Sequence, residues 1–466
     1  MLAQNNPYAV WVEFNPEHYA RDPHLVQTLL LLVTNKNPVA INLTGPRWVG
    51  KSATLKFLKH VISRLQEQEH KNQEQKYEEY RQSISDLFRA EDIIVLCLDL
   101  GDLSSSEEVL SVLVEELYSR LVKPDQLLEE NLLKNIRWEI ASEDSTAEGK
   151  REQIQILSNE AAKMNKRVIL CLDHASESNF LEDKDNIQML GSLVKWISLI
   201  LASRRTLVDD FPLISASPLH NVLIYEQMGL LTFNEAERLL SLSTAEEELA
   251  LSDKDKTLLI KHVGRHPYLL VRAARQAFAH LLSGSGQGKI TESIIQHEID
   301  PALHVVFERL WQEYKEQLLE FYKHHKQEKP NDISQETLFQ LKRDALIFSD
   351  TGKNKEKLFS PLFESFIERK IEKEKALRIH ELDSTVFSDD VSRVLSDLPL
   401  KPGTNEYVIM RLLLENSGQV VKDEEILSVV WEGNGTKHLL DTTVARVRTK
   451  LKEVDAPGEI LRHRNK

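Results

Sequence analysis

Short apolar runs alternate with longer amphipathic segments through the first half of the chain. Five runs have the length and the β-branched content of buried strands, the last of them more weakly: residues 38–44, 93–100, 167–173, 211–217 and 222–229. Between these runs the apolar residues recur at helical spacing, and a capping box at Ser105 and Glu108 marks one helix start. This alternation predicts a parallel sheet with helices on both faces.

The pattern becomes all-helical after a second capping box at Thr232 and Glu235. A long amphipathic helix is expected to begin at Pro267, because proline fits the first turn of a helix. Residues 283–288 predict a flexible connection. Within residues 290–372 the pattern runs helix, short strand, turn, short strand, helix, which is the outline of a winged helix.

Composition narrows the possible functions. The chain has 466 residues, 41% of them hydrophobic, and a net charge of −14, which argues against a protein that coats nucleic acid over its whole surface but allows a local basic face. We see no secretory signal and no stretch long enough to span a bilayer. Cys97 and Cys171 each lie in an apolar run, where we expect them buried and reduced. These features predict a cytoplasmic protein with no membrane partner.

A glycine-rich loop follows the first apolar run. Gly45, four further residues and then Gly50-Lys51-Ser52 stand between a strand and an amphipathic helix, the context of a phosphate-binding loop. In such a loop backbone N–H groups surround the phosphates, Lys51 reaches the β- and γ-phosphates, and the Ser52 hydroxyl binds Mg²⁺. The alternative is an ordinary strand–turn–helix. The predicted nucleotide-binding residues here are Gly45, Pro46, Arg47, Trp48, Val49, Gly50, Lys51, Ser52 and Ala53.

A carboxylate for the metal is expected at Asp173, which ends the run at 167–173 and so faces the crevice at the carboxyl edge of the sheet. ATP or ADP with Mg²⁺ is the predicted ligand. Many hydrolysing P-loop ATPases place a glutamate next, but the next residue here is His174, and Glu177 comes three residues later. The sequence therefore favours binding over fast hydrolysis, so any ATPase activity is expected to be slow. The candidate catalytic residues are Lys51, Asp173, His174 and Ser217.

The stretches "GPRWVGKS", "VILCLDH" and "VGRHPYLL" together resemble the STAND branch of the AAA+ ATPases, which act as nucleotide switches. The resemblance implies that Pro267 touches the base and that Arg265 or His266 senses the phosphates. It also implies a sensor role for Ser217, whose alternative role is to cap a turn, and a contact from Arg21. Without the phosphate loop, "GRHP" would be only a turn before a helix.

The same resemblance allows a homo-oligomer, in which Arg204 and Arg205 could act in trans as arginine fingers. An exposed arginine pair usually has no such role, so this assignment stays open beside the structural one.

Three amphipathic helices are expected near the C-terminus. The third would turn Leu440, Val444, Val447 and Leu451 inward, and its other side would be basic, which suggests DNA recognition. The segment resembles the OmpR-type winged-helix domain of response regulators. On that resemblance the DNA-binding residues are Thr443, Arg446, Arg448, Lys450, Arg462 and Arg464. The usual hairpin wing is missing or very short here, and a winged helix used for protein contacts is the alternative.

The predicted architecture is an α/β P-loop NTPase with a parallel sheet, a helical lid, a winged-helix-like domain and a C-terminal winged helix. We expect a core at residues 1–231, a lid at 232–289, a helical domain at 290–372, a linker at 373–395 and a winged helix at 396–466.

The predicted function is an ATP-dependent STAND-type switch whose nucleotide state controls duplex DNA binding in transcriptional regulation. One alternative is a prokaryotic defence or signalling ATPase that oligomerises and recruits a protein or nucleic-acid partner. A replication-initiator-like ATPase is a third and fits less well, because the last domain is of the response-regulator type.

Overall fold

A computed structural model gives the architecture of the chain. It describes residues 8, 14–68, 77–84, 88–103, 105–121, 146–241, 250–283, 289–327, 333–350, 355–384, 395, 398, 400–402, 404–416, 421–431 and 436–453. The chain forms two compact units, Met1–Glu364 and Ser365–Lys466. No helix among the described residues is both long enough and apolar enough to cross a membrane.

The first unit is built on a five-stranded sheet in which every neighbouring pair is parallel. Its strand order is β2-β3-β4-β1-β5, so the first strand lies inside the sheet between β4 and β5. The strands are β1 (Ala40–Thr44), β2 (Ile93–Asp99), β3 (Arg167–Asp173), β4 (Ser198–Ser203) and β5 (Leu223–Gln227). The predicted parallel sheet is confirmed, and all strands end at the same edge.

One predicted strand is wrong. Residues 211–217 form no strand; they contain the 3₁₀ helix Pro212–Ala216, and a second 3₁₀ helix, Pro218–Val222, follows. Each begins with a proline, whose fixed φ and missing N–H favour a helical first turn over a ladder. The fourth strand is instead β4, whose apolar sequence runs on from the preceding helix without glycine or proline between them.

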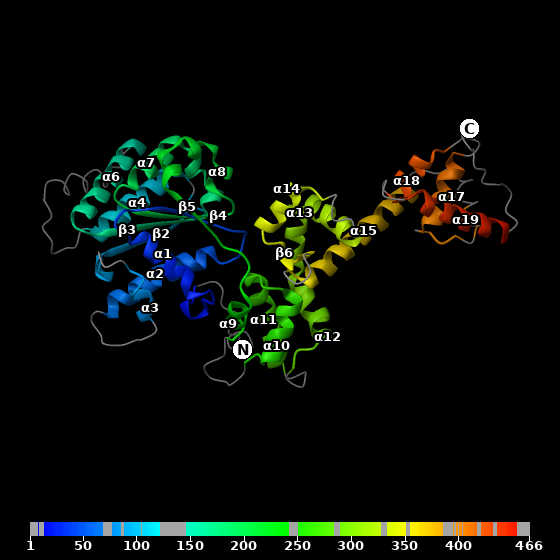
Figure 1. Cartoon of the computed structure of the whole chain (residues 1–466), viewed down its shortest axis with the longest axis horizontal. Helices are drawn as coiled ribbons and strands as arrows, with labels where there is room; N and C mark the ends of the chain where they lie inside the picture. The colour runs from blue at the N-terminus through cyan, green and yellow to red at the C-terminus, as the bar shows by residue number, and fades with distance from the viewer. Residues whose placement is uncertain are drawn as a thin grey trace. The chain divides into compact units, whose positions relative to one another are not determined.

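Helices cover both faces of the sheet, as predicted (Figure 1). One core contains side chains of α1 (Pro23–Val33), α2 (Lys51–Gln68) and the segment around α3 (Glu78–Arg81). The other contains side chains of α4 (Ser106–Leu121), α6 (Ala147–Lys163), α7 (Lys184–Leu193) and α8 (Leu207–Asp210). Because β1, β3 and β4 lie between these layers, they are almost entirely buried, which explains their continuous apolar sequences.

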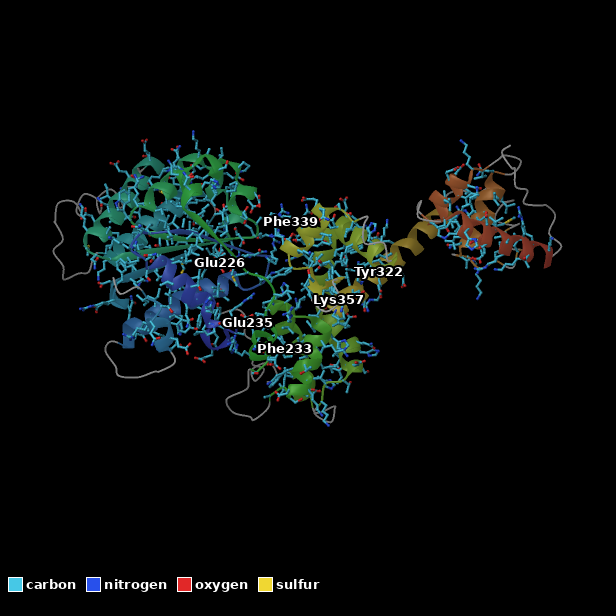
Figure 2. The ribbon with its side chains drawn as sticks, viewed as in Figure 1. Glu226, Phe233, Glu235, Tyr322, Phe339 and Lys357 are labelled. Atoms are coloured by element: carbon cyan, nitrogen blue, oxygen red, sulfur yellow. The ribbon has the colours of Figure 1, made fainter. Side chains whose placement is uncertain are left out.

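Helices follow the sheet in the chain. They are α9 (Phe233–Leu239), α10 (Asp253–Val263), α11 (Pro267–Leu282), α12 (Glu292–Ile294) and α13 (Asp300–Gln327), with a π-helical turn at Ile295–Ile299. The predicted capping box of Thr232 and Glu235 is present, and Pro267 begins α11 as expected. Glu235, labelled in Figure 2, is buried and also accepts a hydrogen bond from the Asp22 N–H at 2.6 Å, which ties α9 to the start of α1.

Gly264, between α10 and α11, lies against the backbone that leads into the next small domain. Its φ is +81°, and a Cβ atom there would lie 2.0 Å from the Phe359 carbonyl oxygen, so only glycine fits. The Ser360 hydroxyl donates to the His262 carbonyl at 3.1 Å in the same region.

The predicted winged-helix outline in residues 290–372 is confirmed by α14 (Gln335–Arg343), an antiparallel pair of β6 (Ile347–Asp350) and β7 (Lys355–Leu358), and α15 (Pro361–Ser384). Phe339 on α14 is 61% exposed (Figure 2). Helix α15 includes the first part of the expected linker; residues 385–394 lie outside the described residues. The predicted boundaries within the first unit stay predictions.

The second unit contains the three expected C-terminal helices, α17 (Asn405–Glu415), α18 (Asp423–Trp431) and α19 (Lys437–Glu453). Met410, Val447 and Leu451 pack in one cluster, and Ile409, Ile426 and Leu440 pack in another. The wing, the tail and the predicted contacts Arg462 and Arg464 lie outside the described residues.

Candidate nucleotide site

The loop between β1 and α2 has the backbone that a phosphate-binding loop requires. Gly50 has φ +103°, a conformation that other residues rarely adopt, and a Cβ on Gly45 would lie 2.4 Å from the Met228 carbonyl oxygen. Trp48 also has a positive φ, +63°. These conformations turn the loop back on itself, and α2 starts directly after it at Lys51.

Lys51 lies across the inside of this loop. Its ammonium donates hydrogen bonds to the carbonyl oxygens of Gly45, at 2.6 Å, and Pro46, at 2.9 Å. Burial lowers the pKa of Lys51 to about 8, although the charge of Asp173 opposes that shift. A phosphate entering the loop would offer this cation a stronger partner than two neutral carbonyl groups.

Asp173 stands at the carboxyl end of β3, buried, and lines the same cavity as Lys51 and Ser52. A hydroxyl and a carboxylate oxygen are ligands that Mg²⁺ accepts, so these residues fit the predicted metal. The Asp173 carboxylate also accepts a hydrogen bond from the backbone N–H of His174 at 2.9 Å. The structure therefore brings the predicted lysine, hydroxyl and carboxylate to one place.

The residue at the usual glutamate position has a partner that the sequence analysis missed. His174 adopts a left-handed backbone, φ +54°, and its Nδ1 lies 2.6 Å from Oδ1 of Asp99. Burial lowers the pKa of His174, but Asp173 and Asp99 outweigh it, so the pKa is raised. Asp99 ends β2 just as Asp173 ends β3, and the two are register partners. The sequence did contain a signal for Asp99: both apolar runs end in an aspartate, and the carboxyl ends of neighbouring parallel strands lie together.

Glu177 does reach the phosphate loop. Its Oε1 lies 3.0 Å from Nη2 of Arg47, and both side chains are 38% exposed. This ion pair joins the loop to the short helix after β3, Ala175–Glu177. Glu177, the first acidic residue after Asp173 in the sequence, thus holds Arg47 beside the cavity.

The segment before α1 closes one side of the cavity. Arg21 donates to the carbonyl oxygens of Val49 at 2.7 Å and Gly229 at 2.6 Å, so it ties the phosphate loop to the turn after β5. Phe14 and Tyr19 line the cavity beside it, and the Tyr19 ring stacks on Phe57 with centroids 4.0 Å apart. The aromatic lining was missed, because two isolated aromatic residues before a helix give no motif.

Residues of the helical half close the cavity from another side. Pro267 and Tyr268 line it at the start of α11, as does Arg309 of α13. Trp48 of the loop stacks on Tyr268 with ring centroids 5.3 Å apart, and the Arg309 guanidinium lies 5.5 Å from the Trp48 ring centroid. Tyr268 and Arg309 were not predicted: Tyr268 directly follows Pro267 in the stretch "VGRHPYLL" but was given no role, and Arg309 belongs to no motif and lies far along the chain.

The two other predicted lid residues lie differently. Arg265 places its guanidinium 5.9 Å from the Phe348 ring centroid and is not among the described residues that line the cavity. His266 is buried against the backbone of Arg47, and burial lowers its pKa to about 4. Of the three, only Pro267 lines the cavity itself.

The end of β4 contributes Ser203 and Arg204 to the cavity. The Arg204 guanidinium pairs with the Glu313 carboxylate and lies 3.2 Å from the Tyr314 hydroxyl, both on α13. Ser217 was assigned to a strand end that does not exist. Its hydroxyl accepts from the Leu219 N–H and caps a 3₁₀ helix, and it is not among the described residues that line the cavity.

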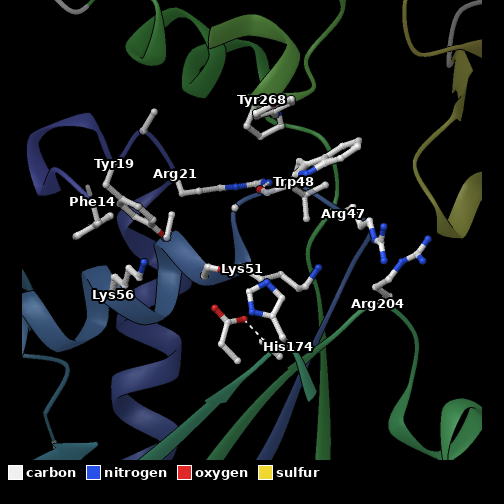
Figure 3. Close-up of a pocket in the computed structure, with 18 of the residues that line it drawn as sticks. Phe14, Tyr19, Arg21, Arg47, Trp48, Lys51, Lys56, His174, Arg204 and Tyr268 are labelled. Atoms are coloured by element: carbon white, nitrogen blue, oxygen red, sulfur yellow. Dashed lines mark hydrogen bonds between the residues drawn. The ribbon is translucent and has the colours of Figure 1, made fainter. Parts of the chain in front are cut away.

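The cavity has a volume of about 540 Å³, within the range of small-molecule sites. In Figure 3, Phe14, Tyr19 and Arg21 lie on one side, Arg47 and Arg204 on the other, and Lys51 and His174 between them. Its cationic side chains outnumber its carboxylates, Asp173 and Glu177. The cations are Arg21, Arg47, Lys51, Lys56, Arg204 and Arg309. Such a lining fits a polyanion.

The predicted DNA-reading helix is α19. Arg446 is exposed and makes a long ion pair with Glu406 at 3.7 Å, while Arg448 and Lys450 are partly exposed. The prediction that Thr443 faces outward is wrong: it is buried, and its hydroxyl donates to the Leu439 carbonyl at 2.8 Å. Thr443 follows Leu440 by three residues and therefore shares its inward face. The outward stripe contains His438, Thr442, Ala445 and Thr449, which the sequence analysis missed, together with Lys452.

The strand order, the loop after the interior strand β1 and the carboxylate at the end of β3 define a P-loop ATPase fold. Residues 397–466 match the protein-family model "Transcriptional regulatory protein, C terminal". The chain thus joins a P-loop ATPase fold to an OmpR-type winged-helix domain, as predicted. No curated protein matches the sequence.

Several solved structures are loosely similar. The Walker-type ATPase PABY2304 of Pyrococcus abyssi is 15% identical, with a TM-score of 0.43, covering 79% of this chain and 100% of that chain. The Aeropyrum pernix ORC1 protein in complex with DNA is 12% identical, with a TM-score of 0.35, covering 93% and 84%. Drosophila ORC bound to DNA is 10% identical, with a TM-score of 0.34, covering 76% and 90%. These TM-scores are all below 0.5, so the fold is assigned from the strand order and the phosphate loop and not from these similarities.

Proposed function

We propose that the chain is a STAND-type molecular switch in which ATP or ADP with Mg²⁺ controls a C-terminal winged helix that binds duplex DNA, in transcriptional regulation. One observation carries the proposal: the cavity beside the phosphate loop is lined both by the sheet edge and by the helical elements, through Pro267, Tyr268 and Arg309. A ligand there contacts both parts at once, so its phosphate state can bias their arrangement.

The roles of the core residues follow from their positions. The backbone of the loop and Lys51 would hold the phosphates, and Ser52 and Asp173 would hold Mg²⁺. The metal would neutralise phosphate charge. Phe14, Tyr19 and Pro267 supply apolar surface for the base at the other end of the cavity. Arg21 holds the loop in place rather than reaching the ligand, because two carbonyl groups already occupy its guanidinium.

A phosphate-sensitive contact is available at Arg204. Its guanidinium points to α13 through Glu313 and Tyr314, yet the residue also lines the cavity. A terminal phosphate would compete with Glu313 for this cation, so triphosphate and diphosphate would favour different positions of α13. Hydrolysis itself is expected to be slow, because His174 stands where a glutamate would orient water.

DNA binding, the output of the proposed switch, is assigned to helix α19. Its outward face combines small or polar side chains, Thr442, Ala445 and Thr449, with the cation Arg446 at its edge. Small residues let a helix approach base edges, and cations bind phosphate groups. The matched family description supports this assignment of residues 397–466 to transcriptional regulation.

The test is equilibrium binding of labelled ATP and ADP to the full-length protein with Mg²⁺, followed by duplex DNA binding in each nucleotide state. Lys51→Ala should remove nucleotide binding, whereas Lys59→Ala, on an exposed position of the same helix, should not. DNA affinity should differ between the two nucleotide states. Unchanged ATP affinity in Lys51→Ala would refute the site. ATP-dependent oligomers that bind no duplex DNA would favour the defence or signalling alternative.

A further inference from the structure

The two cysteines of the chain lie opposite each other on neighbouring strands. Cys97 of β2 is the register partner of Cys171 of β3. The chain has two cysteines in all, and both are free thiols. Every thiol of the protein is therefore in this one pair, and neither the phosphate loop nor the proposed switch uses it.

The position of the pair suits a disulfide. Register partners on adjacent strands project to the same face of a sheet, and neighbouring strands lie about 4.8 Å apart. Disulfides span Cα separations of about 4.4–6.8 Å, so the strand spacing falls within the allowed range. Formation would require side-chain rotation and small strand adjustments rather than unfolding.

The two thiols differ in access. Cys97 is partly exposed, whereas Cys171 is fully buried in the core beneath α2. A small oxidant would therefore reach Cys97 first, and the neighbouring Cys171 would be placed to resolve the oxidised sulfur. A buried resolving thiol next to a reachable one is the arrangement that a reversible pair needs.

The pair lies directly behind the nucleotide site. Two residues further along the same strands, Asp99 and Asp173 are also register partners, and period-two alternation puts them on the same face as the cysteines. Asp173 lines the cavity, and Asp99 holds His174. A covalent bond two residues before them would fix the local spacing of β2 and β3 and so shift both carboxylates.

We propose that Cys97 and Cys171 form a reversible disulfide in response to a peroxide and that this bond weakens binding at the nucleotide site. The Cys97 thiol reduces hydrogen peroxide to water and becomes a sulfenic acid; the Cys171 thiol then attacks that sulfur, which expels a second water and forms the S–S bond. A small dithiol reverses the step by exchange. The link to nucleotide affinity rests on the proposed function; the disulfide does not.

The experiment treats the reduced full-length protein with hydrogen peroxide, blocks remaining thiols with N-ethylmaleimide and measures the intact mass. The expected product has lost two hydrogens, carries no alkyl group and regains both thiols in dithiothreitol. Oxidised protein should bind Mg²⁺–ATP at least about tenfold more weakly than reduced protein, and dithiothreitol should restore the affinity. Cys171→Ala should stop at a sulfenic acid that a dione probe captures, and Cys97→Ser should not respond.

Two results would overturn the proposal: both thiols still alkylated after peroxide treatment and unfolding, or a disulfide that leaves nucleotide affinity unchanged. The wild-type mass measurement decides the first point even if a variant fails to fold. A reduced protein that binds no nucleotide would instead remove the proposed function, and the mass measurement alone would then support or overturn the disulfide.

Discussion

Trp48 of the phosphate loop stacks on Tyr268 of helix α11, with ring centroids 5.3 Å apart and ring planes 22° apart. These residues are 220 positions apart in the chain, yet their contact joins the loop that would hold the phosphates to the lid. The Arg309 guanidinium on the indole adds α13 to the same cluster. The Trp48 side chain thus contacts both α11 and α13 from the phosphate loop.

Removing this stack should weaken nucleotide binding. Tyr268→Leu keeps an apolar side chain but loses the aromatic contact, which is worth about 1 kcal/mol and so about fivefold in affinity. Calorimetry with Mg²⁺–ATP measures it. Tyr225→Leu, at a 43% exposed tyrosine on β5, is the matched control and should bind normally. Equal affinities in the two variants would contradict a role for the stack.

Asp173→Asn should abolish the Mg²⁺ dependence of nucleotide binding, because an amide is a far weaker ligand for this cation than a carboxylate. A loss of about tenfold or more in affinity with Mg²⁺, and little change with EDTA, is the expected result. Asp253→Asn, on α10 with a 96% exposed side chain, is the control. A full Mg²⁺ effect in the Asp173 variant would place the metal elsewhere.

Acid should destabilise the first unit through His266. Burial lowers the pKa of this residue from 6.5 to about 4, so between these values the unfolded chain binds a proton that the folded chain does not. Stability should therefore rise with pH from about 4 to 6.5, by at most about 3 kcal/mol from this group.

Urea unfolding across that pH range measures the effect. His266→Gln should flatten the pH dependence, even if it lowers stability overall, whereas His220→Gln, at an exposed histidine, should leave it unchanged. An equally steep dependence in His266→Gln would show that other groups cause it.

Arg446→Ala should weaken binding of the full-length protein to duplex DNA and lower the slope of log affinity against log salt by about one, the loss of one phosphate contact. Thr443→Val should leave DNA affinity within about twofold, since that side chain faces the helix core. Electrophoretic or fluorescence titrations at several salt concentrations distinguish these outcomes. A larger loss for Thr443→Val than for Arg446→Ala would reverse the assignment of the faces.

Glu313→Gln should raise the affinity for ATP more than for ADP, because it removes the carboxylate that competes with phosphate for Arg204. A gain of a few-fold is expected from one exposed ion pair. Glu316→Gln, three residues along α13, is the control. Equal gains for both nucleotides would mean that Arg204 does not distinguish them.

The features that depend only on residues close together in the sequence could be predicted. A loop with two glycines, a lysine and a serine between a strand and a helix is readable without the fold, and so is a strand that ends in Asp173. The missed strand β4 shows the limit of that approach. Its apolar residues follow helix α7 without a breaking residue, whereas residues 211–217 have the composition of a strand but contain Pro212.

The closure of the cavity could not be predicted from sequence. Tyr268, Arg309 and Arg204 come from three separate elements, and only the strand order of the sheet and the packing of α11 and α13 bring them to the loop. Thr443 is a simpler case, since counting helical positions from Leu440 would have placed it inside.

The tight packing at Gly264 has a mechanical consequence. Backbone that touches backbone leaves no side chain whose rotation could absorb a displacement, so the turn before α11 and the strand end at Phe359 should move together as a rigid body. A small tilt of the lid over a bound nucleotide would then swing the first turn of α15 as well.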